Sequence, residues 1–97
     1  MSRKYTILYI HGMGGGVDSR IPSILNEHIN EYVHDPDIRI DIVVRTYDID
    51  PYIAERQISS WREELRPQLV IGESLGSLHA LLQRGVPHLF VSPAIGA

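Results

Sequence analysis

The sequence predicts an α/β fold of three layers, α/β/α, in which helices cover both faces of a parallel four-stranded sheet. Short apolar runs alternate with longer segments of helical periodicity, and a fourth apolar run ends the pattern. Glycine-rich turns follow the first and the third run. No linker, repeat or low-complexity segment divides the chain, so residues 1–97 are expected to form a single α/β domain. Strands that alternate with helices lie parallel and are joined by right-handed crossovers.

The first half of the chain contains two expected strands and one helix. Residues 5–10 form a mostly apolar, β-rich run of the kind that is buried in a parallel sheet. Residues 21–33 repeat apolar side chains at helical spacing, with Pro22 near the start and Pro36 beyond the end. Residues 38–44 first alternate and then become continuously apolar, which is typical of an edge strand exposed along part of one face.

The second half repeats this arrangement. Asp50 is expected to cap a helix that begins at Pro51. Strands are expected at residues 69–71 and 88–91, with a helix over residues 75–84 between them.

The segment Gly72-Glu73-Ser74-Leu75-Gly76 lies between the third expected strand and its helix. A nucleophile elbow has this G-x-S-x-G pattern, because its strand ends in a turn so sharp that the serine backbone is strained. The flanking glycines let strand and helix pass closely. Backbone N–H groups that are free at the start of the helix can then face an oxyanion. The alternative is a serine that only caps the helix after it.

The first expected strand runs into a glycine-rich loop, His11-Gly12-Met13-Gly14-Gly15-Gly16. Glycines allow N–H groups to converge on one point, which could serve an acyl-transfer oxyanion or a phosphate. The phosphate motifs fit less well, because no Lys-Ser or Lys-Thr follows and the last glycine of the dinucleotide fingerprint is missing. A plain flexible turn is the other alternative.

Together, the His-Gly loop and the elbow resemble the α/β-hydrolase superfamily, and in particular its small, lidless bacterial esterases, the YqiA-like proteins. In these proteins a strand ending in Asn/Ser-Pro-Ala follows the elbow helix, and here residues 88–94 read HLFVSPA. The resemblance implies the strand order 2-1-3-4, with Ser74 as the nucleophile and His11 as a structural residue. The oxyanion hole that it implies consists of the backbone N–H group of Leu75 and that of Gly12 or Met13.

Residues around the two turns complete the candidate site. Those that could line it are His11, Gly14, Glu73, Ser19 and Arg20. Glu73 stands in the variable position before the serine, where it could tune the pocket, or it is a solvated turn carboxylate. Ser19 could line the cleft or cap the helix that follows.

The acid and the histidine of the implied triad have no counterpart in the sequence. The family takes them from later strands, in the order Ser, Asp or Glu, His. We therefore expect residues 1–97 to be the N-terminal portion of a longer hydrolase domain, with little or no activity alone. Four of the five histidines are expected to lie away from Ser74, namely His28, His34, His79 and His88. The base would come from residues after Ala97, from a second chain or, less favourably, from His11.

Composition narrows the classes of function. The net charge of −3, with acidic and basic residues interspersed, gives no reason to expect nucleic acid. No apolar run reaches membrane-spanning length, so no membrane association is expected. Without cysteine the chain needs neither disulfides nor thiolate metal sites, and a cytoplasmic location is expected. No cluster of His, Asp and Glu predicts a metal, and no cofactor is expected.

Three hypotheses follow. The main one is a serine hydrolase that cleaves a small-molecule ester or acyl substrate through Ser74. The second is a non-catalytic α/β module that binds a small anionic ligand with its glycine loop. The third is one half of an assembly, in which the apolar edge strand at residues 88–91 pairs with a second copy or with a partner chain.

Overall fold

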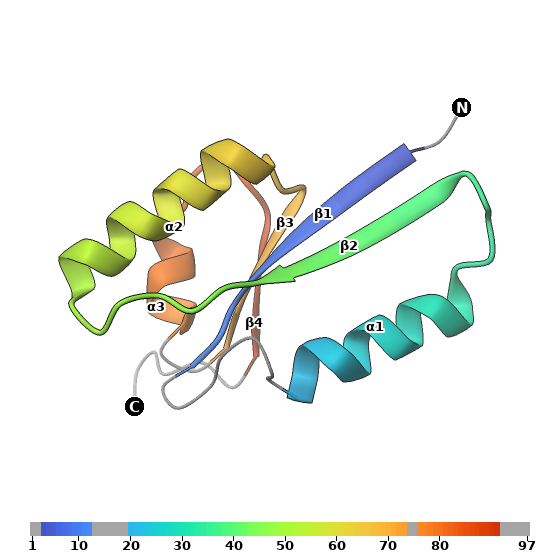
Figure 1. Ribbon diagram of the computed structural model, residues 1–97, viewed down its shortest axis with the longest axis horizontal. Helices are drawn as coiled ribbons and strands as arrows, with labels where there is room; N and C mark the ends of the chain where they lie inside the picture. Colours follow the sequence, from blue (N-terminus) through green and yellow to red (C-terminus); the bar gives the residue numbers. More distant parts are fainter. Residues whose placement is uncertain (1–2, 13–19, 74–75, 92–97) are drawn as a thin grey trace.

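The computed structural model describes residues 3–12, 20–73 and 76–91 (Figure 1). Strands and helices alternate along the chain, which confirms the predicted α/β class. The elements are β1 (Arg3–Ile10), α1 (Arg20–Tyr32), β2 (Ile38–Val44), α2 (Pro51–Leu65), β3 (Leu69–Glu73), α3 (Gly76–Leu81) and β4 (His88–Val91).

The four strands form one parallel sheet in the order β2-β1-β3-β4, as predicted. The register places Ile10 of β1 beside Gly72 of β3. The carboxyl ends of these two strands are therefore neighbours, and both special turns of the sequence leave from the same edge of the sheet.

Helices cover both faces of the sheet, with α2 and α3 on one side and α1 on the other (Figure 1). The face under α2 and α3 carries a continuous apolar core. Its buried members are Leu8, Ile10, Ile58, Val70 and Ala80, and the half-buried Tyr47, Trp61, Leu65, Val86 and Phe90 pack around them. This layer holds β1 and β3 against α2 and α3.

The face under α1 is covered less completely. Pro22 is the only buried residue of α1. On the strands below, Tyr9 and Ile71 are buried, whereas Leu89 of β4 keeps 52% of its surface exposed. The sheet is thus closed on one face and partly open on the other.

The ends of α2 follow from local sequence. Asp50 caps the helix as predicted, because its side chain accepts a hydrogen bond of 2.9 Å from the backbone N–H of Tyr52. Pro51 fits the first turn, where no N–H is needed. At the other end Arg66 adopts a left-handed conformation, with φ of 47°, and its N–H returns to the carbonyl of Arg62.

Helix α3 is shorter than the sequence predicts, because it ends at Leu81 rather than near residue 84. The N–H groups of Leu82 and Gln83 bond to carbonyls only three residues back, which tightens the last turn. Gly85 then has φ of 81°, a conformation that helical residues do not adopt. The chain therefore turns early toward β4.

Among the helices of the described residues, none combines the length and the apolar character that a membrane span requires.

Candidate functional site

The candidate site lies at the carboxyl edge of β1 and β3. Of the residues that the sequence assigns to it, Met13, Gly14, Ser19, Ser74 and Leu75 lie outside the described residues. His11, Gly12, Arg20 and Glu73 lie within them. His11 and Gly12 continue directly from β1, Glu73 is the last residue of β3, and the exposed Arg20 begins α1.

Gly76 brings α3 into direct contact with the end of β1. A Cβ atom built at this glycine would lie 2.1 Å from the carbonyl oxygen of Ile10 and 2.6 Å from that of His11. Both distances are far too short for any side chain, and the obstructing atoms are backbone. Strand β3 ends at Glu73, and helix α3 begins at Gly76. This close passage is what the second glycine of an elbow permits.

The imidazole of His11 is held in a buried position. Its Nδ1 lies 2.7 Å from the carbonyl oxygen of Gly12. A carbonyl can only accept, so Nδ1 carries the hydrogen in this contact. Nε2 is buried and has no hydrogen-bond partner among the described residues. His11 keeps only 5% of its surface exposed, so this nitrogen faces the protein interior.

Tyr47, in the segment after β2, fixes His11 from the other side. The two rings stack with centroids 4.7 Å apart, and the Tyr47 hydroxyl donates a 2.7 Å hydrogen bond to the carbonyl oxygen of His11. Burial, with a smaller contribution from the charge of Glu73, raises the pKa of Tyr47. The hydroxyl therefore stays protonated and remains a donor at neutral pH.

His79 of α3 extends this aromatic row. Its ring meets Tyr47 edge to face at 4.9 Å. Burial lowers the pKa of His79, and the nearby carboxylate of Glu55 opposes that change more weakly. The three rings of His11, Tyr47 and His79 thus pack on one another and link the end of β1 to α3.

Glu73 has a specific partner. The Tyr9 hydroxyl donates a 2.5 Å hydrogen bond to Oε1 of Glu73, across the neighbouring strands β1 and β3. Burial, followed by this hydrogen bond to a carboxylate, raises the pKa of Tyr9. Sequence reasoning considered Glu73 alone and missed Tyr9. The sequence did contain a signal for this contact, because alternate residues of a strand point to the same face of the sheet. Tyr9 pairs with Ile71, and Glu73 lies two residues after Ile71, so Tyr9 and Glu73 share a face.

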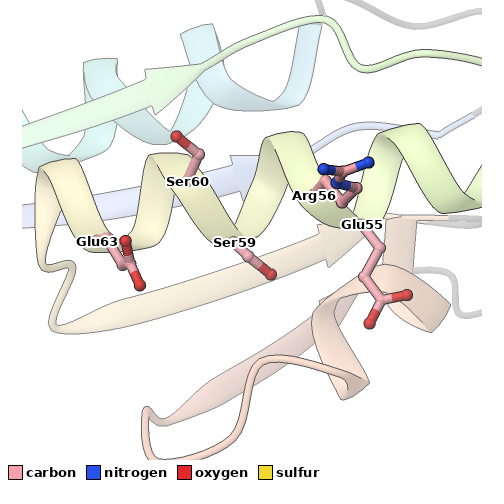
Figure 2. A pocket seen from close by; sticks show the side chains of 5 residues that line it. All are labelled: Glu55, Arg56, Ser59, Ser60 and Glu63. Atoms are coloured by element: carbon pink, nitrogen blue, oxygen red, sulfur yellow. The ribbon is translucent and has the colours of Figure 1, made fainter.

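One surface hollow lies on α2, away from this edge. A shallow depression of about 330 Å³ is lined by Glu55, Arg56, Ser59, Ser60 and Glu63 of α2. Figure 2 shows these side chains on successive turns, with Ser59 and Ser60 pointing to opposite sides of the helix. All five residues are exposed. They do not converge on one point, so this depression lacks the arrangement of a binding site.

Within the described part of the chain, no group of three or more His, Asp or Glu side chains could hold a metal ion. Comparison of the chain with family models, with curated proteins and with solved structures gives no match. The function must therefore be inferred from the sequence motifs and from the geometry of the carboxyl edge.

Proposed function

We propose that the protein is a serine hydrolase of carboxylic esters, with Ser74 as its nucleophile. The observation that carries this proposal is the contact of Gly76 with the carbonyl oxygens of Ile10 and His11. It joins the G-x-S-x-G segment to the end of β1, from which the glycine loop leaves. A nucleophile and an oxyanion hole drawn from these two turns would then face a single substrate.

In this proposal the Ser74 hydroxyl attacks the acyl carbon and gives its proton to a general base. The negative oxygen of the tetrahedral intermediate accepts hydrogen bonds from the N–H of Leu75 and from that of Gly12 or Met13. The alcohol leaves with a proton, and water then releases the acyl group from the serine. His11 acts as a positioning residue, since its Nδ1 contact with Gly12 and its stacking on Tyr47 support the start of the glycine loop.

A fluorophosphonate probe tests whether Ser74 is an activated nucleophile, because it reads a single covalent step on the serine rather than turnover. The expected result is labelling of the natural chain that Ser74→Ala abolishes. Ser59→Ala is the matched control, because Ser59 is exposed on α2 and lies in no proposed site. Equal labelling of the Ser74→Ala variant, or a folded natural chain that takes no label, would overturn the proposal.

The alternative of a module for an anionic ligand has weaker support. Glu73 brings a carboxylate to the same edge, and this charge opposes a bound anion. A titration with inorganic phosphate separates the two functions. The hydrolase proposal expects no saturable binding of phosphate at millimolar concentration.

The proposed partner surface is β4. In the described part of the chain this strand pairs with β3 on one side and ends the sheet order on the other, and its Leu89 is 52% exposed. An apolar outer strand with unpaired backbone groups favours pairing with another chain. Sedimentation at micromolar concentration should therefore reveal self-association, and a strictly monomeric species would count against it.

A further inference from the structure

A cleft runs between α1 and the open face of the sheet. From α1 it is lined by Ile21, Ile24, Leu25 and His28, and from the strands by Tyr9, Ile71, Leu89 and Val91. The α1 residues recur at helical spacing and form one stripe. A different stripe, which includes Pro22 and Asn26, faces β2. Helix α1 therefore stands over the boundary between these two regions and leaves a slot on the side of β3 and β4.

We propose that this slot, the α1 cleft, binds the aliphatic acyl chain of a neutral ester. The inference rests on the proposed function and names the class of substrate for that site. The first observation that supports it is the position of the cleft next to Glu73. Glu73 pairs with Val91 in the strand register and holds the hydroxyl of Tyr9, and both of these residues line the cleft. Glu73 also directly precedes Ser74 in the chain.

The size of the cleft fits an alkyl chain rather than a protein segment. Its volume is about 190 Å³. An apolar cavity of about 150 Å³ is enough to bind a molecule of six carbons such as benzene. Ile21 and His28 are seven residue steps apart, or about 10 Å at the rise of an α-helix. A straight chain of about six carbons is therefore the natural occupant, whereas a stable protein interface needs an area of more than about 1,000 Å².

The chemistry of the lining selects a neutral occupant. Apart from the Tyr9 hydroxyl and the His28 ring, the lining side-chain atoms are apolar, and the Tyr9 hydroxyl is already bonded to Glu73. The carboxylate of Glu73 borders the cleft and repels another carboxylate. An ester would thus be accepted, while the free fatty acid that hydrolysis produces would be bound less well.

Binding of 1-hexanol tests the cleft without any catalytic step. We expect saturable shifts of the NMR methyl signals of Ile71, Leu89 and Val91, and weaker shifts with hexanoate at neutral pH. Leu89→Trp fills the cleft and should weaken hexanol binding at least about tenfold, equivalent to about 1.4 kcal/mol. Leu82→Trp is the matched control, because Leu82 is 56% exposed and lies outside the cleft. It should leave binding unchanged.

A second variant keeps the test decisive if Leu89→Trp disturbs the edge strand. Ile24→Trp fills the cleft from the α1 side, and Ile24 is 38% exposed, so a larger side chain has room to settle. Hexanol that shifts methyl groups under α2 and α3 instead, or that binds a folded Ile24→Trp variant as tightly as the natural chain, would overturn the proposal.

Chain length in the covalent probe separates this inference from the proposed function. A hexyl fluorophosphonate should label Ser74 at least about tenfold faster than a methyl one. Leu89→Trp should remove that preference while keeping labelling by the methyl probe. Labelling without a chain-length preference would overturn the acyl cleft alone. No labelling by either probe would overturn the proposed function and, with it, the assignment of the cleft to an acyl chain.

Discussion

The two faces of the sheet differ in how completely their helices cover them. Under α2 and α3 the buried Leu8, Ile10 and Val70 meet the fully buried Ala54 and Ile58 of α2 and Ala80 of α3. Under α1, by contrast, only Pro22 of the helix is buried. Both faces are apolar, so composition alone does not produce the difference. Two helices, α2 and α3, cover the first face, and α3 approaches β1 closely at Gly76, whereas α1 alone covers the second face (Figure 1).

The two faces are therefore expected to have different roles, one in the stability of the fold and the other in ligand binding. The closed face supplies most of the buried apolar surface and therefore most of the stabilisation of the fold. The open face keeps the apolar α1 cleft beside Glu73, the residue that precedes Ser74. A ligand in this cleft can make the van der Waals contacts that packed side chains make on the closed face. Substitutions should accordingly cost stability on the first face and alter ligand binding on the second.

The largest expected effect is at Gly76. Gly76→Ala would force a methyl group into the backbone of Ile10 and His11, so α3 must move away from β1. We expect a loss of about 4 kcal/mol or more in the free energy of unfolding, at the upper end for single substitutions. Urea denaturation followed by circular dichroism measures it.

Gly85→Ala is the control for Gly76→Ala. Gly85 has φ of 81°, but the nearest atom to its added methyl is an Arg62 side-chain nitrogen at 3.2 Å, which can move. The expected loss is about 1 kcal/mol, the cost of a left-handed conformation. Equal losses of unfolding free energy in the two variants would show that the backbone contact at Gly76 adds no cost of its own.

A matched pair of truncations compares the faces directly. Ile58→Ala removes a fully buried side chain of the closed face and should cost about 3 kcal/mol. Ile24→Ala removes a partly exposed side chain of α1 and should cost about 1 kcal/mol. Unfolding curves of both variants give the comparison, and similar losses would contradict the distinction between a closed and an open face.

The hydrogen bond between Tyr9 and Glu73 should contribute less to the stability of the fold than the buried side chain of Ile58 does. Tyr9→Phe removes the donor to the Glu73 carboxylate, with an expected loss of about 1.5 kcal/mol at neutral pH. Because folding raises the pKa of Tyr9, its contribution is complete below the ordinary tyrosine pKa, about 10, and is lost as the pH rises above that value. The variant should therefore lose less stability than the natural chain above about pH 10. Tyr52→Phe is the control, since Tyr52 is exposed and should show neither effect.

The smallest expected effect is the acid response of His79. Folding lowers the pKa of this residue, so its contribution is present above the ordinary histidine pKa, about 6.5, and is lost as the pH falls through the lowered value. His79→Gln should flatten the decline of thermal stability between about pH 7 and pH 5. His34→Gln, at an exposed position, should not. The same slope in all three proteins would contradict the neutral, packed state of His79.

Much of the fold follows from periodicity and turn chemistry. The ranges of β2 and β4, the cap at Asp50 and the sheet order are as the sequence predicts. These features depend on local patterns, on strand parity and on the family resemblance. The early end of α3 was not predicted, because it depends on hydrogen bonds to carbonyls three residues back and on the conformation of Gly85.

The candidate site was predicted in outline only. The register of Ile10 with Gly72 brings the two special turns to one edge, as the order of strands requires. Predicting the hydrogen bond from Tyr9 to Glu73 requires both the register of β1 with β3 and the face of the sheet to which each side chain points. The stacking of Tyr47 on His11 depends on the path of the chain after β2, which no local pattern encodes. The α1 cleft depends on how one helix is placed over the sheet, and periodicity does not determine that placement.

The most direct test of the whole account is a crystal structure of the chain after reaction with the hexyl fluorophosphonate. The account predicts phosphorus bonded to the Ser74 oxygen at the carboxyl edge of β1 and β3. It also predicts a hexyl chain that lies between α1 and the strands, against Ile71 and Leu89. An adduct on another residue, or a hexyl chain directed toward α2 and α3, would contradict it.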